Sequence, residues 1–425
     1  MKAEEQTIPG PDTIRRREYG NGMVVLVKEN FTSPIVVIDG VLHFGSADVK
    51  REQAGLASFA TSVMMRGTQR RSFQQIFEAI ESVGASVDVG AGLNRSGFGG
   101  KSLAEDLPLV IDILADVLQR PIFPAAEVEK ERGEILTDLE ERADDTQRMA
   151  SLAFRELLYP AGHPYSNSGA GYVETITALK RDDLERFYRE HVGAPGLIAT
   201  IVGAVKADEA FRMWEDAFGN WIGARNERAP LPEAPRLTEP RTKSVHVPGK
   251  TQSDLVLGFV GPPRSAPDYL AAALCNSVLG RFGMMGRLGA KVREKGGMAY
   301  YSYSMLEGGL GPGAWSVVAG VNPANVDRAV KLIAGEIKRM CDTKVPAKEL
   351  ADNKAFITGS LPLRLETNDG VADQLTNMEL YGLGLDYLQK HNDLINAISA
   401  AQVQAAAQKH LDAEAYALAI GGPLG

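Results

Sequence analysis

The feature that most constrains the fold of this 425-residue chain is an internal repeat. When the sequence is shifted by 219 positions, the ends of its two halves align without a gap. The aligned pairs are Leu184 and Val403, Phe187 and Ala406, His191 and His410, Ile201 and Ile420, and Gly203 and Gly422. Both stretches have the pattern of an amphipathic helix, a short break and a strand that ends in glycine. A repeat of about 200 residues is far longer than a solenoid unit, so the sequence predicts two related domains.

A second match and a proline-rich segment support this division. Pro124-x-x-Glu127-Val128 resembles Pro346-x-x-Glu349-Leu350, and in both cases a proline precedes a long helical pattern. Prolines also crowd between residues 222 and 250, which favours an extended linker because proline fixes φ and lacks an amide donor. We therefore expect an N-terminal domain over 1–222, a linker over 223–250 and a C-terminal domain over 251–425.

The order of the expected elements indicates the fold class. Apolar, β-branched runs at 23–27 and 35–43 predict strands, and 85–89 alternates as a strand. Helical patterns cover 53–65, 72–83, 105–118 and 127–142. Because helices mix with hairpin-like strands rather than alternating with parallel ones, we expect an α+β fold. Each domain would be a mostly antiparallel sheet packed on one side by helices.

Composition and charge exclude several classes of protein. The chain is 44% apolar and 24% charged, as soluble globular proteins are, and has no apolar run near the ~20 residues of a membrane-spanning helix. Its net charge of -8 argues against a nucleic-acid partner. Cys275 and Cys341 are expected to be small buried hydrophobes rather than a disulfide framework. The first residues, MKAEEQTIPGPDT, lack the apolar core of a signal peptide. A secreted form whose signal had been removed would look the same, so both a cytoplasmic and a periplasmic location stay open.

An ordered set of motifs runs along the chain. The first is Gly55-Leu-Ala-Ser-Phe-Ala-Thr-Ser-Val-Met-Met-Arg-Gly-Thr68. It is followed by Ile80-Glu-Ser-Val-Gly84, by Glu129-Lys-Glu-Arg132 with Ile135-Leu136, and by His163-Pro-Tyr165. The set resembles the pitrilysin (M16) family of zinc peptidases, in the branch that includes the mitochondrial processing peptidases. The resemblance implies two homologous domains with the pitrilysin-like metallohydrolase fold.

The zinc motif of that family is altered here. The family phrase is G-L-x-H-F-x-E-H, in which two histidines bind zinc and a glutamate serves as base. Ser58, Thr61 and Ser62 occupy these positions, and hydroxyls are poor zinc ligands. The family's third ligand falls on Asp138 and its supporting carboxylate on Glu131. We expect no metal in this chain and interpret both carboxylates as part of a charged helix face.

Other catalytic readings of these residues find little support. Neither Ser58 nor Ser62 lies in a nucleophile-elbow pattern, and no base is placed beside them. No two histidines are three to five residues apart, so we expect exposed or capping roles for all six. The six are His43, His163, His191, His246, His391 and His410.

The second half retains a different motif. Val292-Arg293-Glu-Lys-Gly-Gly-Met-Ala-Tyr300 predicts a helix end, a glycine stop and a strand on which Tyr300, Ser302 and Ser304 face one side. It resembles the family segment L-R-E-K-x-G-L-A-Y. The resemblance implies that Arg293 and Tyr300 reach the peptide at the zinc site. The alternative is that Arg293 stabilises its own helix end while Tyr300 packs on a sheet.

A glycine-rich segment lies just upstream, with Gly280, Gly283 and Gly286. It lacks the lysine and the ending of a phosphate-binding loop. It loosely resembles a glycine-rich loop that touches substrate in the non-catalytic subunit of processing peptidases. A mobile turn between two helices is the simpler interpretation.

Together these motifs favour the non-catalytic subunit of a heterodimeric zinc metalloendopeptidase. A partner subunit with an intact H-x-x-E-H motif would hold the zinc, and this chain would contribute Arg293 and Tyr300 toward a peptide substrate. Two alternatives remain: a structural subunit of the kind found in respiratory complexes, and a module that binds peptides without cutting them.

Overall fold

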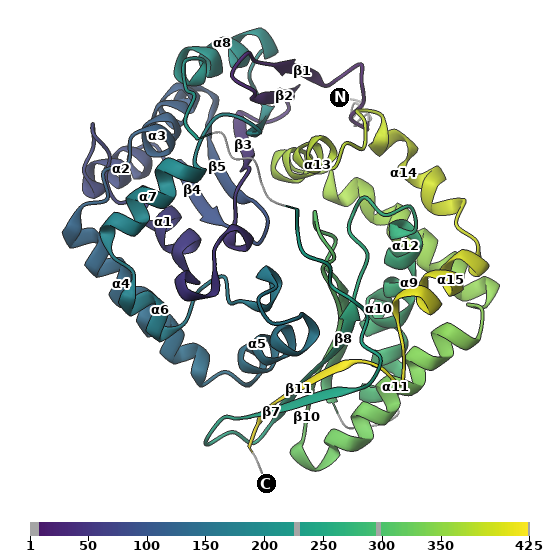
Figure 1. Cartoon of the computed structure of the whole chain (residues 1–425). Helices are drawn as coiled ribbons and strands as arrows, with labels where there is room; N and C mark the ends of the chain where they lie inside the picture. Colours follow the sequence, from purple (N-terminus) through teal and green to yellow (C-terminus); the bar gives the residue numbers. More distant parts are fainter. Residues whose placement is uncertain (1–7, 225–229, 295–298, 424–425) are drawn as a thin grey trace. The chain divides into compact units, whose positions relative to one another are not determined.

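A computed structural model describes residues 8–224, 230–294 and 299–423 of the chain. The chain forms two compact units, and each unit combines segments from both halves of the sequence (Figure 1). The first unit consists of residues 1–136, 169–229 and 360–391, and the second of residues 137–168, 230–359 and 392–425. The boundaries drawn at 222 and 250 therefore stay a prediction about the sequence repeats.

The first unit is built on a six-stranded sheet in the order β1-β2-β6-β3-β5-β4. Strands β2 and β6 are parallel, and every other neighbouring pair is antiparallel. The strands are β1 (Arg15–Glu18), β2 (Val24–Glu29), β3 (Ile35–Leu42), β4 (Ser86–Ala91), β5 (Ser96–Leu103) and β6 (Ile198–Gly203).

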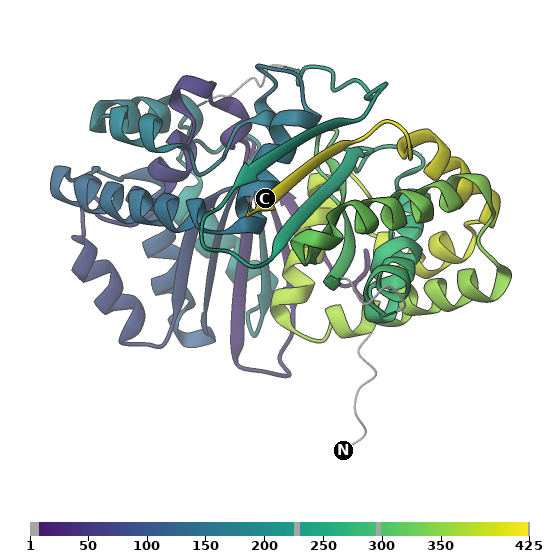
Figure 2. The ribbon, with the colours of Figure 1, turned by 90° about the horizontal axis from the view of Figure 1, so that it is seen from below.

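The second unit repeats this topology with one strand fewer. Its sheet has the order β7-β11-β8-β10-β9, in which β7 and β11 are parallel and the other pairs are antiparallel (Figure 2). The strands are β7 (Arg241–His246), β8 (Ser253–Val260), β9 (Ala299–Leu306), β10 (Ala314–Val321) and β11 (Ala417–Gly422). Without β1, the two sheets agree in strand order and in direction. The expected α+β fold with mostly antiparallel sheets is confirmed.

The helices follow the repeat as closely as the strands do. Helix α7 (Arg181–His191) and strand β6 correspond to α15 (Ala400–His410) and β11, and all four boundaries differ by the 219 positions found in the sequence. Likewise α4 (Ala125–Ala143) corresponds to α12 (Ala347–Arg364). The remaining α-helices are α1 (Leu56–Met64), α2 (Phe73–Glu81), α3 (Leu107–Gln119), α5 (Thr146–Leu158), α6 (Val173–Ala178), α8 (Ala207–Phe218), α9 (Tyr269–Gly280), α10 (Phe282–Leu288), α11 (Val326–Asp342), α13 (Asn368–Leu380) and α14 (Tyr387–Asn396).

The two repeats exchange one helix. Helix α5, from the first half of the sequence, packs on the second sheet. The backbone of α5 lies so close to Gly421 of β11 that no side chain would fit there. Helix α13, from the second half, packs on the first sheet, where Val371 and Leu375 join Val37 and Val41 in one core. Each sheet is thus covered by a helix that is distant in sequence (Figure 1).

Helices cover both faces of the first sheet, so the expectation of a sheet packed on one side was wrong. Residues Val37 and Val41 of β3 face α13. On the alternate face, Phe98 of β5 lies over Gly40 and stacks on Trp214 of α8. The exchanged helix could not be seen in the order of elements along the chain, because it belongs to the other repeat.

Part of the proline-rich segment is also ordered as structure. Within 223–250, Arg241–His246 forms the edge strand β7. Pro240 and Pro248 lie just outside this strand, so their missing amide donors remove no hydrogen bond from the sheet. Over the part of the chain that the structure describes, no helix is both long and apolar enough to cross a bilayer.

Candidate functional site

Helix α1 carries the three hydroxyl residues that occupy the zinc-motif positions. It begins after Gly55, whose φ of 95° favours glycine, and it buries Leu56, Phe59 and Val63 in the core. The hydroxyl of Ser58 donates to the carbonyl oxygen of Gly169 at 2.9 Å. These contacts hold the helix in place without any metal.

The other two hydroxyl residues follow the same pattern. Thr61 is buried, and its Oγ1 lies 3.0 and 2.9 Å from the carbonyl oxygens of Ala57 and Ser58, to which it donates. Such back-bonding to the helix backbone is a common role of buried threonine. Ser62 is half-buried on the same helix. Thr61 and Ser58 therefore direct their hydroxyls to backbone oxygens rather than to a metal site.

The buried carboxylate of Glu131 on α4 pairs with a guanidinium. Arg66 forms an ion pair with Glu131 and two further contacts, at 2.5 Å to Glu134 and 3.6 Å to Glu127. Burial alone would lower the pKa of Arg66, but Glu131 and Glu134 raise it, so the guanidinium stays charged. The carboxylate of Glu131 is therefore neutralised by a positive side chain of the same unit.

The second repeat contains an ion pair of the same kind. Arg287 is buried, and its guanidinium donates to both carboxylate oxygens of Glu349 at 2.8 and 2.7 Å. Glu349 lies on α12, the counterpart of α4, at the position that matches Glu127. Because both repeats hold this long helix with an arginine, the Arg66 cluster reads as part of the scaffold.

Asp138, at the position of the third ligand, is half-exposed. Both of its carboxylate oxygens accept hydrogen bonds from Arg148, at 3.0 and 2.8 Å. Among the described residues, no group of three or more histidine, cysteine, aspartate and glutamate side chains could hold a metal ion. The residues present at these positions do not fit zinc.

Tyr300, in the second half, has a different environment. Its side chain is 72% exposed at the start of β9. Gly320 of β10 pairs with Tyr301 and Val321 pairs with Ala299, so Tyr300 is a β-bulge residue without a partner on β10. No hydrogen bond or ring contact to the described residues holds its phenol. The alternative in which Tyr300 packs on a sheet does not describe this side chain.

The expected alternation along β9 holds only after the bulge. Ser302 and Ser304 are fully buried, whereas Tyr300 is exposed. Arg293 lies in the π-helix η5 (Gly289–Glu294), next to the buried Val292, and its side chain is outside the described part of the chain. Residues 295–298, which include the expected glycine stop, are also outside it.

The three glycines of the glycine-rich segment lie in helices α9 and α10. The interpretation as a mobile turn between two helices was therefore wrong. A Cβ at Gly280 would lie 2.4 Å from the amide nitrogen of Ser304, and one at Gly286 would lie 2.7 Å from the carbonyl of Val278. Gly280 thus lets α9 lie close to β9, and Gly286 lets α10 lie close to α9. Gly283 has a φ of 56° and open space beside it. Gly283 and Gly286 line a cavity of about 320 Å³ that ends at Arg287 and Glu349.

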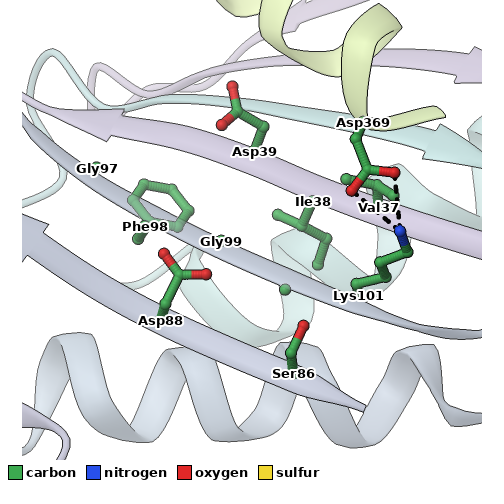
Figure 3. Close-up of a pocket in the computed structure, with 11 residues that line it drawn as sticks. Val37, Ile38, Asp39, Ser86, Asp88, Gly97, Phe98, Gly99, Lys101 and Asp369 are labelled. Atoms are coloured by element: carbon green, nitrogen blue, oxygen red, sulfur yellow. Dashed lines mark hydrogen bonds and ion pairs between the residues drawn. The ribbon is translucent and has the colours of Figure 1, made fainter. Parts of the chain in front are cut away.

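A second cavity, of about 240 Å³, lies on the first sheet and was missed in the sequence. Asp39 of β3 and Asp88 of β4 line it, and Lys101 of β5 pairs with Asp369 of α13 at 2.9 Å (Figure 3). Burial raises the pKa of both Asp39 and Asp88. The sequence feature that could have revealed this cavity is Asp39, a charged residue within the apolar run 35–43. The walls can accept hydrogen bonds, but acidic groups alone do not define a ligand.

The cysteines and histidines have no part in either site. Cys275 is fully buried, as expected, and Cys341 is half-buried with its thiol pKa raised by burial to about 11. His163 is a cap, since its Nδ1 accepts from the amide of Tyr165 at 3.0 Å, but it is buried rather than exposed. His410 bonds to Asp268 at 2.8 Å.

Comparison with known families gives two matches that together cover most of the chain. The model described as insulinase (peptidase family M16) matches residues 24–162. The model described as peptidase M16 inactive domain matches residues 178–356.

Individual relatives agree with these matches. An uncharacterized zinc protease of Streptomyces coelicolor is 28% identical over 377 residues, which are 87% of this chain and 81% of the relative. The mitochondrial-processing peptidase subunit beta of Bos taurus is 23% identical, over 89% of this chain and 78% of the relative. A solved structure from Pseudomonas fluorescens, described as a peptidase M16 inactive domain, has a TM-score of 0.89 at 23% identity and covers 97% of this chain and 98% of its own. A protease from Helicobacter pylori has a TM-score of 0.87 at 17% identity, over 96% and 98% of the two chains. At these identities the two structures show the fold alone.

Proposed function

The chain belongs to peptidase family M16, and on that premise we propose that it is the non-catalytic subunit of a heterodimeric zinc metalloendopeptidase. A partner subunit of the same family, with an intact H-x-x-E-H motif, would hold the zinc and activate the attacking water. This chain would bind and orient an extended peptide through Arg293 and Tyr300. By itself it would hydrolyse nothing.

The observation that carries the proposal is the exposed phenol of Tyr300 on its bulge. A phenol that is largely exposed and has no hydrogen bond or ring contact to the described residues adds little to the packing of those residues. Bulges are frequent beside active sites, where they direct a side chain. At the zinc-motif positions, by contrast, Thr61 and Ser58 are bonded to backbone oxygens.

The chemistry expected of the two residues is hydrogen-bond donation. A guanidinium presents several N–H donors and a phenol presents one O–H. Both can bond a peptide carbonyl and bond more strongly to the oxyanion that develops from it during attack by water. Such donors contribute to turnover only if they are aimed at that oxygen, which requires a fixed strand and helix behind them.

The relatives support the assembly only by analogy. One of them is itself a subunit, the beta subunit of a processing peptidase. A structural subunit would have no use for an exposed phenol at position 300. A module that only binds peptides would use the phenol, but it would gain no activity from an H-x-x-E-H partner.

The test is reconstitution. The chain is mixed with an M16 subunit that carries H-x-x-E-H and is encoded nearby, and a quenched-fluorescent peptide library is the substrate. Cleavage is expected only in the mixture, and a chelator should abolish it. If the partner alone cleaves as fast as the mixture, this chain has no catalytic role.

The matched control for the proposed residue lies on the same strand. Tyr303 is a phenol of β9 outside the bulge, and its oxygen accepts from Gln147 at 3.2 Å. Tyr300→Phe should lower the turnover of the mixture, whereas Tyr303→Phe should not. Binding of the partner, measured by size exclusion, should be the same for both variants.

A further inference from the structure

The bulge at Tyr300 adjoins a row of paired residues in the second sheet. Tyr301, the next residue, pairs with Gly320 of β10, and Gly320 pairs in turn with Asp254 of β8. These three residues form a row across three neighbouring strands. The hydroxyl of Tyr301 donates to Oδ1 of Asp254. This hydrogen bond joins the two outer residues of the row across Gly320.

Gly320 is the residue that makes this bond possible. A Cβ built on Gly320 would lie 2.7 Å from Cε1 of the Tyr301 ring and 2.6 Å from Nε2 of Gln252. The Tyr301 ring therefore occupies the space that a side chain at 320 would need. In a regular central strand, glycine has no local advantage, and it often marks a bulge or a close approach.

Asp254 is a buried carboxylate whose other bonds tie the row to a helix. Only 2% of Asp254 is exposed, and its Oδ2 accepts from the hydroxyl of Thr146, at the start of α5. Gln252 donates to both carboxylate oxygens, at 3.2 and 3.4 Å. A buried charge is stable only when its oxygens are bonded in this way. The row is therefore anchored to α5 as well as to the sheet.

We infer that Asp254, Gly320 and Tyr301, here called the Tyr301 clasp, fix the bulge in β9 and thereby position the phenol of Tyr300. The clasp fixes Tyr301 against β10 and β8 at the point where the register shifts. Tyr300 is then forced outward, because its neighbour cannot rotate. Asp254 and Tyr301 are positioning residues, and their effect on turnover rests on the function proposed above.

A purely structural role would not single out Tyr300. Tyr303 lies on the same face of β9, two residues beyond Tyr301, where the register is regular. The hydroxyls of Tyr303 and Tyr301 are both bonded to Gln147, at 3.2 and 3.3 Å respectively. Removing the Tyr303 hydroxyl takes only a bond to Gln147. Removing the Tyr301 hydroxyl takes a bond to Gln147 and the bond to Asp254, so only the loss at Tyr301 should release the bulge.

The first experiment uses the full chain alone and needs no activity. The chain is labelled with 3-fluorotyrosine, and the ¹⁹F signal of Tyr300 is assigned by its absence in Tyr300→Phe. In Tyr301→Phe this signal should narrow and move toward the position of free fluorotyrosine. In Tyr303→Phe it should stay unchanged. A Tyr300 signal that is the same in both variants overturns the inference.

The second experiment uses the reconstituted complex. Tyr301→Phe should lower kcat about 10- to 100-fold with a smaller change in KM, because misplacement of a donor mainly affects the transition state. In a Tyr300→Phe background the same change should cost nothing further. Losses that simply multiply would overturn the inference. If Tyr300→Phe itself has no effect on turnover, the proposed function fails, and the ¹⁹F result still decides whether the clasp holds the bulge.

Discussion

Helix α1 and strand β9 carry the two family motifs, and they differ in what their polar side chains touch. On α1, Ser58 and Thr61 bond to carbonyl oxygens of their own unit. On β9, Tyr300 projects from a bulge without a partner among the described residues. Each of these two hydroxyls satisfies a backbone oxygen and needs no metal to do so. Tyr300 has no such bond to the described residues, as the proposed role in recognition requires.

The largest effect expected from this comparison concerns bound zinc, which should be either present at one ion per chain or absent. The purified chain should hold no stoichiometric zinc, because the hydroxyls are bonded to backbone oxygens, Glu131 pairs with Arg66 and Asp138 pairs with Arg148. Elemental analysis after dialysis measures this directly. One tightly held zinc per chain would remove the difference between the two motifs.

The next effect separates the motifs by turnover. In the reconstituted complex, Tyr300→Phe and Arg293→Ala should each lower kcat by about 10² to 10³, the usual contribution of an oxyanion donor. Ser62→Ala, at a position where the resemblance places a zinc ligand, should leave kcat unchanged. Steady-state kinetics on one peptide compares the three variants. If Tyr300→Phe and Ser62→Ala give equal rates, neither motif contributes to turnover.

A third effect tests the structural reading of the first motif. Arg66→Ala leaves Glu131 buried without its partner, since the arginine side chain is only 12% exposed, and should cost about 3 kcal/mol of unfolding free energy. Arg148→Ala breaks the half-exposed pair with Asp138 and should cost at most about 1 kcal/mol. Urea unfolding gives both values. Similar costs for the two variants would show that Arg66 is not a structural anchor.

The smallest effect concerns the cavity of the first sheet that Asp39 and Asp88 line. Burial raises the pKa of Asp88, so the folded chain binds this proton more tightly than the unfolded chain. Stability should then fall as pH rises from the unfolded pKa through the higher folded pKa. Asp88 is nevertheless exposed on its strand, so solvent screening keeps the effect small. Asp88→Asn should remove that fall and stabilise the chain at pH 7, relative to pH 4, by at most about 0.5 kcal/mol. Urea unfolding of both chains at the two pH values provides the measurement, and a loss of stability at pH 7 would contradict it.

Much of the fold was predictable because it is repeated. The 219-position match predicted a helix followed by a strand that ends in glycine in each half, and the structure has α7 with β6 and α15 with β11 there. The exchange of α5 and α13 was not predictable, since hydrophobic periodicity shows that a helix has an apolar face but not which sheet that face covers. The motif positions followed from the sequence as well. The bulge did not, because an alternating pattern contains no sign that one residue will lack a partner.

The exchange of α5 and α13 has a consequence for synthesis on the ribosome. Strands β2 to β6 are complete once Gly203 has emerged, and domains generally fold as they emerge. One face of this sheet, with Val37, Val41 and Val202, is covered by α13, which is made only after the whole second sheet except β11. Until the ribosome has passed Leu380, the nascent chain therefore displays an apolar surface of the kind that chaperones bind.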